Sequence, residues 1–226
     1  MKITFPHMGN IAIPLKAFFQ TLGIEVIEPP PITDRTIGLG SRYSPEFACL
    51  PLKINVGNYL EAYERGADTI IMAGGVGPCR FGYYAQVQRE ILADLGVKYE
   101  MIVLEPPRGH FWQTLGQVWK LAGRASPARI WQAGRLAWAK LVLLDRLDRL
   151  AARTRCREIN RGETGELYRR ALAWLDAAAT LPEVTAAERR IRTAFEEVAV
   201  RDATPLRVGL LGEIYTVLEP AANLNI

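Results

Sequence analysis

The chain has 226 residues, of which 49% are hydrophobic, and it carries a net charge of +4 and three cysteines. This composition supports a buried core and excludes a disordered chain or a small secreted disulfide framework. The sequence contains neither an uncharged apolar run of about 18 residues nor a signal-peptide pattern. We therefore expect a cytoplasmic protein that does not span a membrane.

The positive charge is concentrated between Arg124 and Arg161. A basic helical segment is one feature of nucleic-acid-binding proteins, but no binding motif of a known type accompanies it. We interpret the segment as a solvated helix face and do not expect a nucleic-acid partner.

The first part of the chain predicts a strand, a helix and a second strand. Lys2 to Phe5 forms the first strand, and apolar residues from Ile13 to Leu22 follow at helical spacing until Gly23. Ile24 to Ile27 forms the second strand. Residues 32 to 48 contain two glycines and a proline, which predicts a loop, either without regular structure or containing a short helix.

Two cysteines come next, each at the predicted start of a helix. Cys49 precedes a helix that Pro51 opens and Gly66 ends. Cys79 follows the apolar strand Thr69 to Met72 and a glycine-rich turn, and a helix then runs to Leu95. A helix start offers free N–H groups and a positive dipole end, which favours a thiolate.

Tyr99 to Leu104 adds a fourth strand, so residues 1 to 105 alternate strand and helix. This pattern predicts an α/β fold with an open, mostly parallel, doubly wound sheet. Sites in such folds lie outside the carboxyl ends of the strands. We expect that edge to bring together His7, Cys49, Cys79 and the segment 105 to 110.

Helical periods replace strand signals from Phe111 to about Val200. Trp131 to Leu150 is apolar over much of its circumference, but its charged residues exclude a membrane span. We expect this helix to pack on other helices or on a second subunit.

Strand-like residues return from Leu206 to Tyr215, and Pro220 to Ile226 resembles the beginning of a helix. The predicted organisation is an α/β domain with the cysteine loops (1–110), a helical subdomain (111–203), and a return strand with the start of a helix (204–226). A strand and half a helix lack the rest of a βαβ unit, so two interpretations stay open: this helix completes the domain, or the last segment is the beginning of a truncated second α/β domain.

Cysteine thiolates at two helix starts on one sheet edge suit an iron–sulfur cluster, because the dipoles offset its negative charge. The candidate metal ligands are Cys49, Cys79 and, in a different basic helical setting, Cys156. The spacing of these cysteines is weak evidence for a metal site, since no C-x-x-C pair occurs. The alternative is that they are unreactive thiols in the core.

A second interpretation uses the glycine turn as an anion site. Gly75 and Gly77 lie where a turn opens a helix, although the P-loop lysine and hydroxyl residue are missing. Lys53 and Arg80, near the starts of their helices, are candidate partners for an anion or for cluster sulfur, or else ordinary surface charges. His7 and His110 are candidate acids or ligands, with ordinary loop hydrogen bonds as the alternative.

Three segments carry a resemblance to a known family: Phe5 to Asn10, Tyr43 to Lys53, and Gly74 to Tyr84. Together they resemble the 2-hydroxyacyl-CoA dehydratase and benzoyl-CoA reductase superfamily, in particular its activase-associated branch that is related to double-cubane cluster proteins. The likeness extends over most of the chain. Cys156 does not fall in a motif that matches.

This resemblance implies an oxygen-sensitive iron–sulfur protein, with a [4Fe–4S] cluster held by Cys49 and Cys79 and shared between subunits or with further sequence. It implies an electron-transfer or reductase component that works with an ATP-hydrolysing activase on low-potential reduction, with an acyl-CoA thioester as the candidate substrate. A homo-oligomer is expected. The alternatives are a non-catalytic α/β module that binds an anionic small molecule or a partner protein, and an oligomerisation role for the helical part.

Overall fold

The computed structural model describes residues 1–75, 79–104, 116, 121–123, 125–206 and 208–224. The chain divides into two compact units. The sheet unit comprises residues 1–12, 22–126 and 211–226, and the helical unit comprises residues 13–21 and 127–210. Each unit has its own core of buried side chains.

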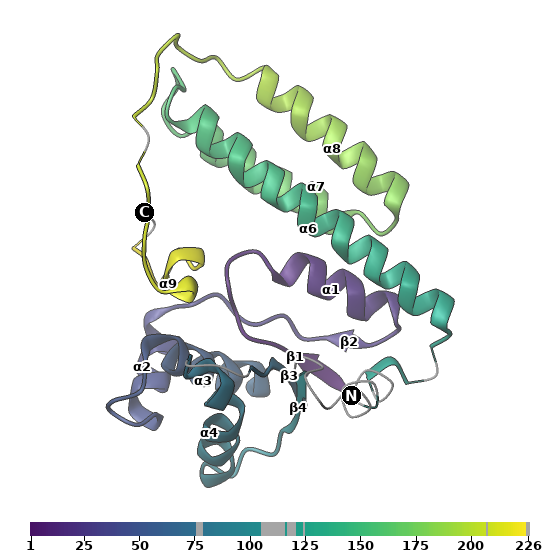
Figure 1. Cartoon of the computed structure of the whole chain (residues 1–226), viewed down its shortest axis with the longest axis vertical. Helices are drawn as coiled ribbons and strands as arrows, with labels where there is room; N and C mark the ends of the chain where they lie inside the picture. The colour runs from purple at the N-terminus through teal and green to yellow at the C-terminus, as the bar shows by residue number, and fades with distance from the viewer. Residues whose placement is uncertain (76–78, 105–115, 117–120, 124, 207, 225–226) are drawn as a thin grey trace. The chain divides into compact units, whose positions relative to one another are not determined.

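Four parallel strands form the sheet of the sheet unit, in the order β2-β1-β3-β4 (Figure 1). The strands are β1 (Lys2–Thr4), β2 (Glu25–Val26), β3 (Thr69–Ala73) and β4 (Glu100–Leu104). β3 is buried along most of its length because it lies inside the sheet and carries four consecutive buried residues. The strand order reverses between β1 and β3, which makes this pair the switch point where sites form in open α/β sheets.

Two helices cover one face of β3. The helices α3 (Leu50–Glu64) and α4 (Phe81–Asp94) contribute most of the cluster that packs around Ile70 and Met72 of the strand. Tyr59 of α3 and Tyr84 of α4 are the largest of these side chains, and both are almost fully buried. Burial of these side chains fixes the two helices to the sheet.

The helix α2 (Asp34–Tyr43) packs closely along α3, and two glycines make this approach possible. A Cβ atom on Gly40 would lie 1.8 Å from the carbonyl oxygen of Lys53, and one on Gly57 would lie 2.0 Å from that of Thr36. Neither position has room for a side chain. Glycine therefore sets the distance between the two helix backbones.

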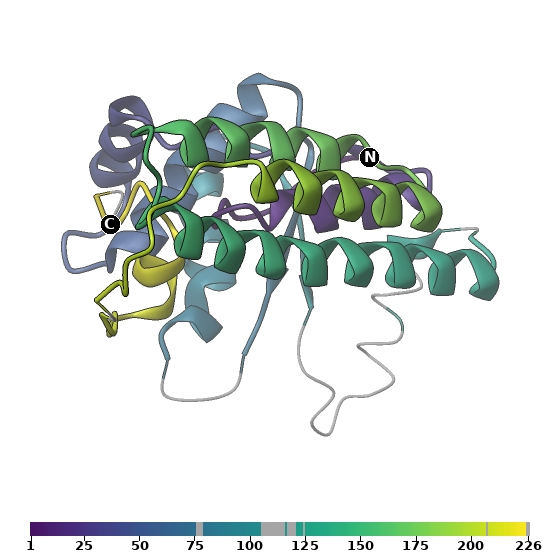
Figure 2. The ribbon, with the colours of Figure 1, turned by 90° about the horizontal axis from the view of Figure 1, so that it is seen from above.

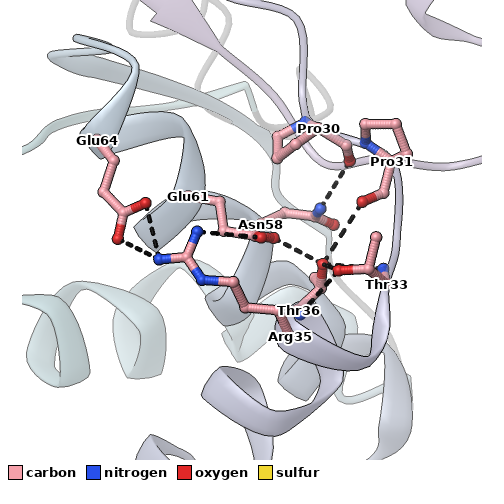
Figure 3. Close-up of polar contacts among 8 residues, drawn as sticks. All are labelled: Pro30, Pro31, Thr33, Arg35, Thr36, Asn58, Glu61 and Glu64. Atoms are coloured by element: carbon pink, nitrogen blue, oxygen red, sulfur yellow. Dashed lines mark hydrogen bonds and ion pairs between the residues drawn. The ribbon is translucent and has the colours of Figure 1, made fainter.

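A polar network fixes the same pair of helices (Figure 3). The Thr36 hydroxyl donates to the buried Glu61 carboxylate at 2.6 Å, and Arg35 makes ion pairs with Glu61 and Glu64. The Asn58 side chain donates to the carbonyl oxygen of Pro30, which ties the chain before α2 to α3. Burial of Glu61 is tolerated because its carboxylate is hydrogen-bonded.

The helical unit consists of α6 (Pro127–Arg155), α7 (Glu163–Ala177), α8 (Leu181–Glu196) and most of α1 (Ala12–Thr21). The three long helices run alongside one another (Figure 2) and bury a shared leucine-rich core. Lys140 lies in this core, where its ammonium group donates to the carbonyl oxygen of Asp176 at 2.9 Å. Burial lowers the pKa of Lys140, because the charged form loses its hydration.

The α/β fold and the parallel sheet confirm the fold predicted from the sequence. At residues 32 to 48 the structure differs from the predicted loop, because Asp34–Tyr43 forms the ten-residue helix α2. The two glycines of this helix favour a loop when the sequence is considered alone. At the other end, the described residues from 206 to 213 form no strand, and Ile214–Leu218 forms the short helix α9. A strand needs a neighbour to pair with, and this segment has none among the described residues.

Candidate functional site

The carboxyl end of the parallel sheet gathers both early cysteines near one tyrosine. Cys49 is the residue that caps the start of α3, and Cys79 lies two residues before α4 begins. Tyr84 lies in the first turn of α4, and its hydroxyl is within hydrogen-bond distance of the Cys49 thiol. We call Cys49, Cys79 and Tyr84 the cysteine rim.

The thiol of Cys49 is hydrogen-bonded to the Tyr84 hydroxyl, with 2.6 Å between sulfur and oxygen. Cys49 has an extended backbone, and its side chain makes no capping bond to the helix that follows. The sulfur is therefore not used to satisfy the helix N–H groups. It is half-buried, which leaves one side open to a ligand.

Tyr84 is 5% exposed and packs against the ring of Phe81, with 5.4 Å between ring centres. Burial raises the pKa of Tyr84 strongly, and the hydrogen bond to Cys49 and the nearby Cys49, Glu213 and Cys79 add to this. The phenol therefore stays protonated at neutral pH. Its proton is available to the sulfur of Cys49.

Cys79 is exposed and lies two residues before α4. Gly82 lets Gly75, two residues after β3, approach the start of α4, since a Cβ atom on Gly82 would lie 2.4 Å from the carbonyl oxygen of Gly75. Gly75 itself has open space around it, so the structure does not require glycine there for steric reasons. Gly77 lies outside the described residues, as do His110 and the segment 105 to 110.

A buried carboxylate that the sequence analysis did not single out lies at the switch point. Glu219 is 3% exposed and accepts hydrogen bonds from the Gly9 backbone N–H at 2.6 Å, from the Ala221 N–H at 3.1 Å, and from His7 Nδ1, which lies 2.9 Å away. Burial by itself would raise the pKa of Glu219, but the bonds from His7, Gly9 and Ala221 outweigh it and the pKa is lowered. Glu219 thus fastens the segment after α9 to the loop after β1, and it orients His7.

Gly9 is required for this fastening. Its φ angle is +51°, and a Cβ atom would lie 2.8 Å from the carbonyl oxygen of Leu218. The only signal that could have indicated Glu219 from the sequence is its place beside a proline after a short apolar run, which many surface loops share. The contact joins positions more than 200 residues apart, so local patterns do not encode it.

The remaining predicted site residues have simple local surroundings. The Lys53 ammonium group donates to the carbonyl oxygen of Glu46 at 3.1 Å, and Arg80 is exposed at the start of α4. Cys156 belongs to the helical unit, where it follows the end of α6 and its thiol donates to the carbonyl oxygen of Arg153. A helix C-terminus carries a partial negative charge, so this thiol lacks the helix-start setting of the other two.

The donor set of the cysteine rim suits part of an iron–sulfur site. Two sulfurs at helix starts are soft anionic ligands next to positive dipole ends, and the Tyr84 hydroxyl supplies a hydrogen bond of the kind that clusters accept. Over the described parts of the chain, however, no three side chains of His, Cys, Asp or Glu are grouped closely enough to hold a metal ion. The rim therefore offers two candidate ligands from one chain.

Among the residues that the structure describes, no helix has both the length and the apolar character needed to cross a membrane. Comparison with known proteins adds no relative, because no family model, no curated protein and no solved structure matches the chain. The family resemblance of the three sequence segments stays a prediction.

Proposed function

We propose that this protein is an iron–sulfur electron-transfer or reductase component, with Cys49 and Cys79 as cluster ligands. The observation that carries the proposal is the hydrogen bond between Cys49 and the buried Tyr84, which lies on α4, the helix that Cys79 precedes by two residues. Structural core thiols are buried among apolar side chains, whereas here one thiol is half-buried and the other is exposed. A bound cluster would supply one-electron redox chemistry at a low potential.

Cubane clusters take four ligands, and one chain offers two at the rim. We propose that the cluster is a [4Fe–4S] cluster completed by the same two cysteines of a second copy. Exposure of Cys79 supports a shared site, because its sulfur is accessible from outside the chain. The electron donor would be an ATP-hydrolysing activase, and an acyl-CoA thioester would be the class of molecule reduced.

The test is anaerobic purification followed by iron and sulfide analysis and visible absorption spectroscopy. Cys49→Ser and Cys79→Ser should each remove most of the bound iron, while Cys156→Ser, the matched control, should retain it. A colourless wild-type protein without iron or sulfide after anaerobic purification and reconstitution would refute the proposal. Retention of full iron content by both rim variants would refute the ligand assignment.

A second candidate function is an anion-binding module without a metal. The contact that favours it is Glu219, because a carboxylate already lies on the Gly9 N–H and beside His7 at the switch point. An anionic ligand with the same geometry would compete with Glu219 for these donors. A rise in melting temperature with an acyl-CoA or a nucleotide, in protein free of iron, would support this function over the first.

A further inference from the structure

The outer face of α6 carries two tryptophans that the helical unit does not cover. Trp131 is 71% exposed and Trp138 is 67% exposed, whereas Leu136, Leu143 and Leu147 on the opposite side lie in the core. The two tryptophans are seven residues apart, so they lie on the same side of the helix, two turns from each other. Large exposed apolar side chains grouped in this way mark an interaction surface.

The residues of this outer face follow one another at intervals of four and three. We call them the outer stripe, and they are Trp131, Arg135, Trp138, Val142, Asp145 and Arg149. Arg135 is exposed, Val142 is partly exposed, and the side chains of Asp145 and Arg149 are 57% and 69% exposed. Alternating intervals of this kind form the contact line between two helices that pack along each other.

The outer stripe is complementary to itself in one direction only. If a second copy of α6 lies antiparallel with the two-fold axis at position 140, Trp138 meets the partner subunit's Val142 and Arg135 meets the partner subunit's Asp145. Trp131 then meets the partner subunit's Arg149. These are an apolar contact, an ion pair and a cation–π contact. In a parallel arrangement in register, each arginine would instead face the same arginine of the other copy, which is unfavourable.

From this complementarity we infer that the protein forms a two-fold dimer through the outer stripes of two antiparallel α6 helices. A two-fold axis uses the same patch on both subunits, so each cross-helix contact occurs twice. Asp145 already pairs with Arg149 in its own helix, and the second copy would add Arg135 to this pair. The inference is independent of the proposed redox function, because it uses only residues of the helical unit.

The contact is long but narrow. The stripe from Trp131 to Arg149 covers about 27 Å of helix at 1.5 Å per residue. One helix face buries less area than a standard protein interface, so we expect dissociation in the range of about 1–100 μM rather than a permanent dimer. The measurement must therefore span concentrations on both sides of this range.

Sedimentation equilibrium of the full chain, prepared without iron so that no shared cluster joins two copies, tests the inference. We expect the wild-type mass to rise from monomer to dimer with concentration. Trp138→Glu should remain a monomer, since it places a charge opposite Val142. Arg192→Asp is the matched control: it changes an exposed arginine of α8 that, like Arg149, pairs with a carboxylate one turn away. This control should dimerise like the wild type.

A charge exchange tests the register. Arg135→Asp and Asp145→Arg should each weaken the dimer at least tenfold, because like charges then meet across the axis, and the double variant should restore it. Circular dichroism checks that every variant is folded. A wild-type protein that stays monomeric throughout this concentration range would overturn the inference. A dimer that the tryptophan and charge variants leave unchanged, or a double variant weaker than both single ones, would overturn it equally.

Discussion

Two glycines of α2, two residues apart, should respond oppositely to the same substitution. Gly38 has open space where a Cβ atom would be, whereas a Cβ atom on Gly40 would lie 1.8 Å from the carbonyl oxygen of Lys53. Ordinary contact needs about 3.5 Å. Gly40→Ala therefore forces α2 and α3 about 1.5 Å apart, and backbone atoms cannot rotate out of the way.

The magnitudes follow from the two environments. Alanine in an exposed helix position is more stable than glycine by about 1 kcal/mol, so Gly38→Ala should raise the free energy of unfolding by up to that amount. Gly40→Ala gains the same propensity but overpacks the helix pair and pulls Thr36 away from Glu61. Overpacking costs about 1–3 kcal/mol and the strained hydrogen bond to a charged group about 1.5–3 kcal/mol, so we expect a net loss of about 2–4 kcal/mol.

Urea denaturation followed by circular dichroism measures both variants against the wild type. The slope of the free energy with urea should stay the same, which shows that only stability has changed. Gly57→Ala, which would place a Cβ atom 2.0 Å from the carbonyl oxygen of Thr36, should repeat the loss from the other helix. If Gly40→Ala is as stable as the wild type, the close packing of α2 on α3 is wrong.

Three further predictions concern the rim and the helical core. Glu219→Gln should raise the rate of amide hydrogen exchange of residues 213 to 224 by about 30-fold or more, because an amide side chain cannot accept from all three donors. Glu213→Gln changes only an exposed cap of α9 and should raise this rate less. The folded pKa of Glu219 is lowered, so the free energy that this carboxylate contributes to folding is present above the unfolded pKa of about 4.3 and is lost as the pH falls through the folded pKa. Equal hydrogen-exchange rates in wild type and Glu219→Gln at neutral pH would contradict this prediction. Tyr84→Phe should lower the reduction potential of the reconstituted cluster, because it removes a hydrogen bond to Cys49. Spectroelectrochemical titration measures this potential, and Tyr83→Phe, which changes an exposed neighbour, should leave it unchanged. The folded pKa of Lys140 is lowered, so the free energy of unfolding should rise as the pH increases from this folded pKa to the unfolded value of about 10.4. Lys140→Met should lose this rise relative to wild type in denaturant titrations at each pH.

Much of the fold could be predicted from local patterns. The strands β3 and β4 could be predicted because their apolar residues are consecutive, and α3 and α4 because theirs recur at helical spacing. The helix α2 was missed because Gly38 and Gly40 indicate a loop by composition, although Gly40 is a contact residue between helices.

The candidate site was predicted in part. The cysteines were placed correctly at helix starts, since proline and glycine mark where helices begin. Tyr84 and Glu219 were not identified as site residues. Tyr84 is one tyrosine in an amphipathic helix, and Glu219 is one glutamate beside a proline. Neither local pattern predicts the contact with a sulfur or with a backbone N–H, because the partner residue is distant in the sequence.

The sequence by itself determined the four strands of the sheet, the helices α1, α3 and α4, and the positions of Cys49 and Cys79 at helix starts, because these depend on neighbours within a few residues. Only the tertiary structure decided that Tyr84 is hydrogen-bonded to Cys49, that Glu219 holds the loop after β1, and that Trp131 and Trp138 remain uncovered. Each of these depends on the distance between segments far apart in the chain. Such distances are set by the packing of the whole unit, where glycines such as Gly9 and Gly40 allow backbones to approach and buried polar groups must find partners.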